Sequence, residues 1–148
     1  MGNATVQIDD DFIRRIDSYH SDAVIGRYSK DFGVSEAQAT SAFTAFKQFM
    51  VACGTKPGIK VGSEPIDNMW HTFLLHSREY DQFCSDHFGF FIHHDPSPEL
   101  DHSEHYFSTR EYVEGIFGEL DERFWPIHAP AGLRCISGHY CRTKCTNR

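Results

Sequence analysis

Residues 35–54, SEAQATSAFTAFKQFMVACG, contain the clearest helical pattern of the chain. Ser35, followed by Gln38 three residues later, forms a capping box that marks a helix start, and Gly54 is typical of a helix end. We interpret the face between them as part of a protein core rather than as a cofactor pocket. Its apolar side chains recur at helical spacing: Ala39, Ala42, Phe43, Phe46, Phe49, Met50 and Cys53.

Further helices are predicted on both sides of this segment. Apolar spacing predicts a short helix around residues 12–19 and a second helix over residues 23–32. Downstream, we expect one long helix over residues 65–88 and a last helix over residues 106–124. Strand patterns are few. The predicted fold class is therefore mainly α, an irregular bundle of four to five helices with a Cys-rich C-terminal tail.

The composition is typical of one acidic, aromatic-rich globular domain. Of 148 residues, 40% are hydrophobic and 13 are phenylalanine, enough for a single core. We expect one helical domain over residues 1–133 and a separate tail over residues 134–148. The net charge of −7, with scattered acidic residues, argues against a nucleic-acid partner. Neither a signal-peptide pattern nor a membrane-spanning apolar run is present, so we expect a soluble cytoplasmic protein with no membrane partner.

Residues 64–96, EPIDNMWHTFLLHSREYDQFCSDHFGFFIHHDP, hold five of the ten histidines. Asp67 and His71 stand four residues apart, so a helix places both side chains on one face. If the chain turns back after the helix, His93 or His94 joins them, and three ligands with an open position are typical of a catalytic metal site. Zinc is the expected ion. In the alternative interpretation, Asp67 only fixes the tautomer of a core-edge His71, and the histidine pair caps a helix end.

Several residues of this stretch form an ordered pattern: a WH pair, a tyrosine, an FC pair, an FG pair and a histidine pair before proline. They are Trp70, His71, Tyr80, Phe83, Cys84, Phe88, Gly89, His93, His94 and Pro96. The pattern resembles that of bacterial members of the glycine-rich-domain-containing-protein-like family. The resemblance implies a domain type and not a reaction. Plant members carry a second histidine two residues after the first, where this chain has Phe73, so the resemblance implies no such ligand here.

The tail holds a second group of potential metal ligands. Thiolate and imidazole are ligands that zinc prefers. The spacing, C-x3-H-x-C-x3-C, lacks the CxxC of a standard zinc finger. A zinc site, a disulfide and a flexible reduced tail are therefore all open interpretations, and neighbouring basic residues favour reactive thiols. The four residues are Cys135, His139, Cys141 and Cys145.

Three functions are compatible with these residues. The first is a small helical zinc-binding module that acts through protein–protein interaction, with exposed aromatic residues as its contact surface. The second is a metal-dependent hydrolase that uses the Asp-His-His set above, with Glu79 or Tyr80 near the ion. The third, metal storage or redox sensing, depends on the abundance of Cys and His alone. We favour the interaction module, because no catalytic acid or nucleophile stands out.

Overall fold

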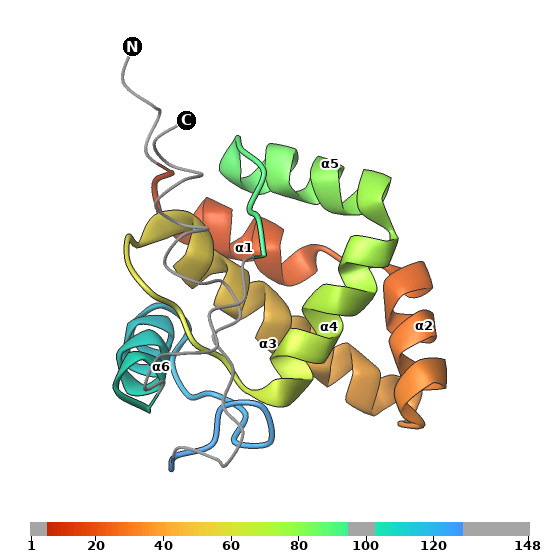
Figure 1. The fold of residues 1–148 in the computed structure, drawn as a ribbon. Coiled ribbons are helices and arrows are strands. Elements are labelled where there is room, and N and C mark those ends of the chain that lie inside the picture. The colour runs from red at the N-terminus through yellow and green to blue at the C-terminus, as the bar shows by residue number, and fades with distance from the viewer. Residues whose placement is uncertain (1–5, 95–102, 129–148) are drawn as a thin grey trace.

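The computed structural model describes residues 6–94 and 103–128, and this part of the chain is mainly helical (Figure 1). It contains six α-helices and no β-strand, and none of its helices combines the length and apolarity needed to cross a bilayer. The predicted mainly α bundle is therefore confirmed for the described residues, which hold six helices instead of the expected four to five, whereas the Cys-rich tail lies outside them. In chain order the helices are α1 (Asp10–Ser18), α2 (Asp22–Phe32), α3 (Glu36–Thr55), α4 (Glu64–Leu75), α5 (Ser77–Phe88) and α6 (Ser103–Phe117).

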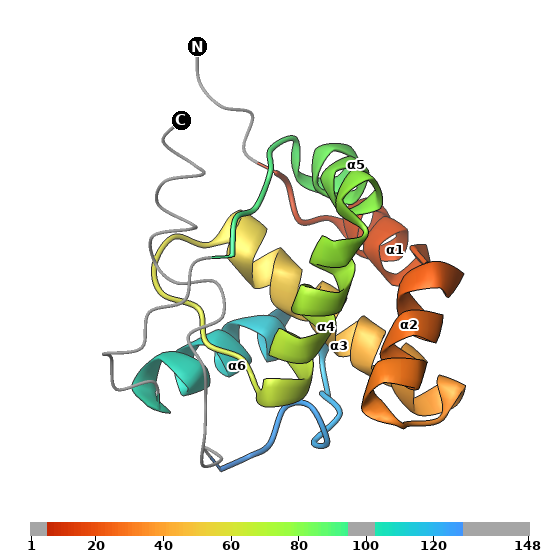
Figure 2. The ribbon, with the colours of Figure 1, turned by 45° about the vertical axis from the view of Figure 1, so that its right-hand side comes forward.

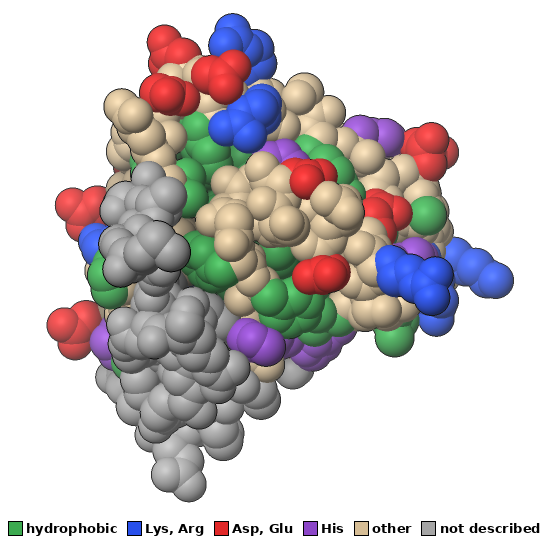
Figure 3. All heavy atoms as spheres, turned by 90° about the horizontal axis from the view of Figure 1, so that it is seen from above, with side chains coloured by type: hydrophobic (Ala, Val, Ile, Leu, Met, Phe, Trp, Pro, Cys, Tyr) green, Lys and Arg blue, Asp and Glu red, His purple; other side chains and the backbone are tan. Residues whose placement is uncertain are grey.

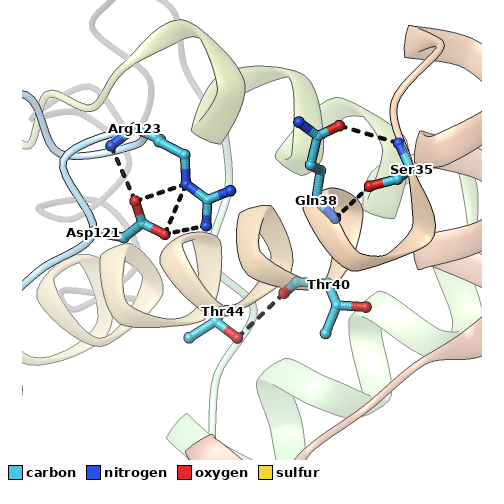
Figure 4. A network of polar contacts seen from close by, with 6 residues as sticks. All are labelled: Ser35, Gln38, Thr40, Thr44, Asp121 and Arg123. Atoms are coloured by element: carbon cyan, nitrogen blue, oxygen red, sulfur yellow. Dashed lines mark hydrogen bonds and ion pairs between the residues drawn. The ribbon is translucent and has the colours of Figure 1, made fainter.

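Helix α3 is the central element of the bundle. The predicted capping box is present: the Ser35 hydroxyl accepts a hydrogen bond from the Gln38 backbone N–H (3.1 Å), and Gln38 Oε1 accepts one from the Ser35 N–H (3.2 Å), as Figure 4 shows. The helix ends at Thr55, one residue beyond the predicted end. Helices α1, α2, α4 and α6 all pack against α3 (Figures 1 and 2). The face interpreted as core is indeed buried there.

The single long helix predicted over residues 65–88 is wrong, because the structure has two helices there. The chain turns at His76 (φ −98°, ψ 63°), between α4 and α5. In one straight helix, Phe73 and Phe83 would lie about 15 Å apart along the axis. In the structure their ring centroids are 5.5 Å apart. The turn therefore lets both helices bury their aromatic residues in the same core.

The last helix is shorter than predicted. Helix α6 ends at Phe117, and the following Gly118 has a left-handed φ of 80°, a conformation that commonly ends helices. The next residues form turns in which Arg123 and Asp121 pair at 2.6 Å (Figure 4). Trp125 is nevertheless fully buried. The apolar residues near position 124 thus belong to the core without being helical.

A buried lysine of α3 holds the end of α1. Lys47 is 3% exposed, and its ammonium donates hydrogen bonds to the carbonyl oxygens of Ile16, Asp17 and Tyr19 at 2.8–2.9 Å. These carbonyls lie at the C-terminal end of α1, where a positive charge is favourable. Burial lowers the pKa of Lys47 to about 8. The contact keeps the Tyr19 ring against α5, with its centroid 4.8 Å from that of Phe83.

Candidate metal centre

Helix α4 presents a carboxylate and an imidazole on the same face. Asp67 and His71 lie one helical turn apart, and 3.4 Å separates Asp67 Oδ1 from His71 Nε2. Only 4% of the Asp67 side chain is exposed, against 56% of the His71 side chain. A buried carboxylate needs a hydrogen-bond donor or a cation to offset its lost hydration. The pair is therefore a candidate site at the edge of the core.

The loop after α5 turns back toward α4 (Figure 2). Gly89 ends α5 with a φ of 78°, which glycine adopts without a steric penalty. The Tyr80 hydroxyl then donates a hydrogen bond to the carbonyl oxygen of Ile92 in the loop. The same hydroxyl accepts a hydrogen bond from Trp70 Nε1–H at 3.0 Å. Trp70 and Tyr80 together fix the backbone two residues before His94.

The loop brings His94 to the α4 pair. The imidazole of His94 stacks on the indole of Trp70, with ring centroids 4.6 Å apart and planes 11° from parallel. Only 8% of the His94 side chain is exposed. Its Nε2 atom lies 3.0 Å from Asp67 Oδ1 and 2.9 Å from His71 Nε2. Within the described part of the chain, these three residues are the one group of His, Cys, Asp or Glu side chains close enough to share an ion.

The spacing of the three atoms fits one face of a tetrahedral metal site. Zinc–nitrogen and zinc–oxygen bonds of about 2.0–2.1 Å, at tetrahedral angles, place neighbouring ligand atoms about 3.3 Å apart. The observed separations are 2.9, 3.0 and 3.4 Å. No further ligand from residues 6–94 or 103–128 joins the group. The exposure of His71 gives solvent access to the cluster.

Protons on the two imidazoles alone cannot make all three contacts hydrogen bonds. A neutral imidazole has one N–H, so each Nε2 atom offers either a proton or a lone pair. If both Nε2 atoms carry protons, two N–H groups face each other at 2.9 Å. If either lacks one, its lone pair faces the Asp67 carboxyl oxygen. A cation in the middle removes this conflict, because all three atoms then direct lone pairs toward it.

The other ring nitrogen of His94 also bears on the site. Nδ1 is buried and has no hydrogen-bond partner among the residues that the structure describes. A metal bound at Nε2 leaves the imidazole proton on Nδ1, and metal-ligating histidines generally donate that proton to a carboxylate, a carbonyl or a water. If Nδ1 carries this proton, none of the described residues accepts a hydrogen bond from it.

The other predicted site residues do not join the cluster. His93 is exposed, so His94 is the loop histidine that lies beside the α4 pair. Gly89, and not the histidine pair, caps the end of α5. Glu79 accepts a hydrogen bond from the Tyr19 hydroxyl at 3.0 Å, because the turn between α4 and α5 takes it off the face of the candidate ligands. The tail residues lie outside the described part of the chain: Cys135, His139, Cys141 and Cys145.

Trp70 and Tyr80 support the site in ways that ligand chemistry did not predict. From the sequence we expect Tyr80 near the ion and assign neither residue a role in holding a loop. The sequence signal that could have indicated this supporting role is their position in the ordered pattern, Trp70 in the WH pair and Tyr80 at the tyrosine. In the structure, Trp70 stacks on His94, the third candidate ligand, and Tyr80 fixes the loop that carries His94.

Tyr80→Phe is expected to weaken metal binding while the helices remain folded. The substitution removes the hydroxyl that joins Trp70 Nε1 to the Ile92 carbonyl and keeps the buried ring. Loss of such a supporting group lowers metal affinity by about 10–100-fold. The unpaired indole N–H costs about 1–3 kcal/mol of stability. Competition with a chromophoric zinc chelator measures the affinity, and circular dichroism measures the helix content. An unchanged dissociation constant would contradict the positioning role.

Comparison with known proteins places the site within a family. The model of a family described as UCP032817-like matches residues 11–111, which cover α1 from its second residue, α2 to α5, the first part of α6 and all three candidate ligands. No curated protein and no solved structure matches the chain. The resemblance to the glycine-rich-domain-containing-protein-like family stays a prediction.

Proposed function

The chain belongs to the UCP032817-like family, and we propose that it binds one zinc ion through Asp67, His71 and His94. The convergence of the three ligand atoms, 2.9–3.4 Å from one another, carries this proposal. Two imidazoles and a carboxylate form a ligand set that zinc accepts. The bound ion holds the loop after α5 against α4, so that binding free energy contributes to the stability of this region.

In this proposal the zinc-bound loop belongs to a surface that binds another protein. Phe91, in the same loop, is 36% exposed, and Leu75, at the end of α4, is 64% exposed. On the face seen from above, hydrophobic side chains and histidines reach the surface side by side (Figure 3). Exposed aromatic residues on a rigid backbone are favourable contact points for a partner. The ion adds to the rigidity that Trp70 and Tyr80 give the loop.

A metal-dependent hydrolase is the second candidate. Three protein ligands with an open fourth position are typical of catalytic zinc, which lowers the pKa of a bound water to about 7. The 56% exposure of the His71 side chain favours access of a substrate. However, Glu79 and Tyr80, the two groups expected to assist, bond to Tyr19 and Ile92 instead. The interaction module therefore remains the first choice.

Metal storage or redox sensing draws little support from the described cysteines. Cys53 and Cys84 are both 0% exposed. Reactive thiols are generally accessible and lie in electropositive surroundings. Such a function would therefore rely on the tail cysteines, outside the described residues.

Elemental analysis of untagged protein, purified without a chelator, tests the metal site. We expect about one zinc per chain in the wild type and almost none in His71→Ala. Helix content should not change, because His71 is largely exposed. Full zinc retention in the variant, or a wild type that takes up no metal even after incubation with Zn²⁺, would contradict the site. Iron in place of zinc would overturn the choice of ion.

The melting temperature of the same variant separates the two candidates. If the ion holds the loop in place, its loss in His71→Ala removes metal-linked stabilisation and lowers the melting temperature. If the ion is catalytic, the variant melts near the wild type but hydrolyses no test ester or phosphoester. A wild type that turns over neither substrate leaves the interaction module as the supported function.

A further inference from the structure

A second candidate site lies between α6 and the loop that joins α3 to α4. A cavity of about 220 Å³ is lined there by the loop residues 56–60, which include Lys56 and Lys60 beside the apolar Pro57 and Ile59, and by polar side chains of α6. Figures 1 and 2 both show the loop running beside α6. We propose that this cavity binds a phosphate group, either as inorganic phosphate or as part of a small phosphorylated molecule. It shares no residue with the metal cluster.

The face of α6 that lines the cavity is polar. His105, Ser108, Thr109 and Tyr112 follow the i, i+3, i+4, i+7 spacing of a single helix face. This face is turned toward the loop, because the Thr109 hydroxyl accepts a hydrogen bond from the Val61 N–H at 3.1 Å. A helix face directed at the rest of the protein is normally apolar. Here Ser108 and His105 offer a hydroxyl and an imidazole to the cavity, whereas the Thr109 hydroxyl donates to the His105 carbonyl oxygen at 2.7 Å.

Two ammonium groups add positive charge to this polar surface. Lys60 is 2% exposed, and its Nζ donates a hydrogen bond to the Gly58 carbonyl oxygen at 2.7 Å. Lys56 Nζ lies 4.8 Å from the ring centroid of Tyr112, whose hydroxyl pairs with Thr55 Oγ1 at 2.7 Å. These contacts restrict where both cations lie. No acidic residue of the described chain lines the cavity.

Phosphate fits both the chemistry and the size of this cavity. Lysine binds phosphate as a point charge, and the Ser108 hydroxyl can donate to another phosphate oxygen. The volume of about 220 Å³ lies below the roughly 300–1,000 Å³ of pockets for drug-sized ligands. The chain as a whole carries a net charge of −7 and repels anions. Binding an anion therefore needs a local group of cations such as this one.

Isothermal titration calorimetry with inorganic phosphate, on the full chain as purified and at constant ionic strength, tests the proposal. We expect saturable binding that Lys56→Met weakens about tenfold or more, since a charged hydrogen bond contributes about 1.5–3 kcal/mol. Ser108→Glu, which adds a negative charge at an exposed lining position, should weaken it similarly. Lys30→Met, which removes an exposed lysine of α2, is the matched control and should leave the dissociation constant unchanged.

The His71→Ala variant distinguishes this site from the metal centre. Phosphate that binds in the cavity should have the same affinity in His71→Ala as in the wild type, whether or not the wild type holds metal. Loss of binding in His71→Ala would assign the phosphate to the metal and overturn the proposal. Absence of saturable binding in the wild type, or equal affinity in Lys56→Met, Ser108→Glu and the wild type, would also overturn it.

Discussion

His94→Ala is expected to abolish zinc binding, whereas His93→Ala leaves it intact. His94 directs Nε2 toward Asp67 and His71 from a buried position stacked on Trp70. Loss of a direct ligand should lower the affinity by more than the about 10–100-fold attributable to a supporting residue. His93 is exposed, and its ring packs at 4.7 Å from that of a loop phenylalanine instead. The affinity is measured by competition with a chromophoric zinc chelator.

The two variants form a matched pair, because each removes an imidazole from neighbouring positions of one loop. Circular dichroism of both should show the helix content of the wild type, since neither residue is part of a helix. If both variants lost zinc equally, the conformation of the loop would control zinc binding, and His94 Nε2 would not act as a specific ligand. Full zinc binding in His94→Ala would remove this residue from the ligand set.

Phe73→Ala is expected to lower the free energy of unfolding by about 3–5 kcal/mol. Phe73 is 0% exposed and lies where α3, α4 and α5 meet. For a chain of this size, each kcal/mol corresponds to about 2–4 °C in melting temperature, so we expect a fall of about 6–20 °C. Urea denaturation followed by circular dichroism gives the free energy. The ring centroid of Phe73 lies 5.3–5.8 Å from those of Phe43, Phe46, Tyr80 and Phe83.

Leu75→Ala on the same helix is the control. Leu75 is 64% exposed, so its truncation should change the stability by no more than about 0.5 kcal/mol. If Phe73→Ala lowered the free energy of unfolding as little as Leu75→Ala, the aromatic cluster would not hold α4 and α5 together. The packing of Phe73 against Phe83 would then not account for the turn at His76.

Position 73 also bears on the resemblance to the plant pattern with a second histidine. Two residues along an α-helix correspond to a rotation of about 200°. Phe73 accordingly lies in the core, whereas His71 is exposed beside Asp67. In this fold, a side chain at position 73 is directed away from the candidate ligands. The absence of histidine there therefore leaves the Asp67, His71 and His94 cluster complete.

The predictions that hold are those that depend on one helix at a time. The capping box of Ser35 and Gln38 is present as expected, because both partners lie within one turn. The proximity of Asp67 and His71 follows equally from the i, i+4 geometry. Such relations are local, so the spacing of residues is sufficient to predict them.

The predictions that fail concern where helices end. The pattern over residues 65–88 is helical throughout, yet the chain turns at His76. The reason is the gain from packing Phe73 against Phe83, which lie ten residues apart. Likewise, Trp125 extends the apolar pattern of the last helix but is buried from a turn beyond Gly118. Periodicity describes a helix face and contains no information on which partner that face will meet.

Helical spacing alone is sufficient to predict a mainly helical protein with a carboxylate and an imidazole on one face of a helix. The packing of the helices decided that His94, rather than His93, reaches that pair. It also decided that Trp70 and Tyr80 hold the loop, through the ring stack and the hydrogen bond to Ile92. A loop has no periodicity, so its path follows from contacts with distant residues that appear only when the helices pack.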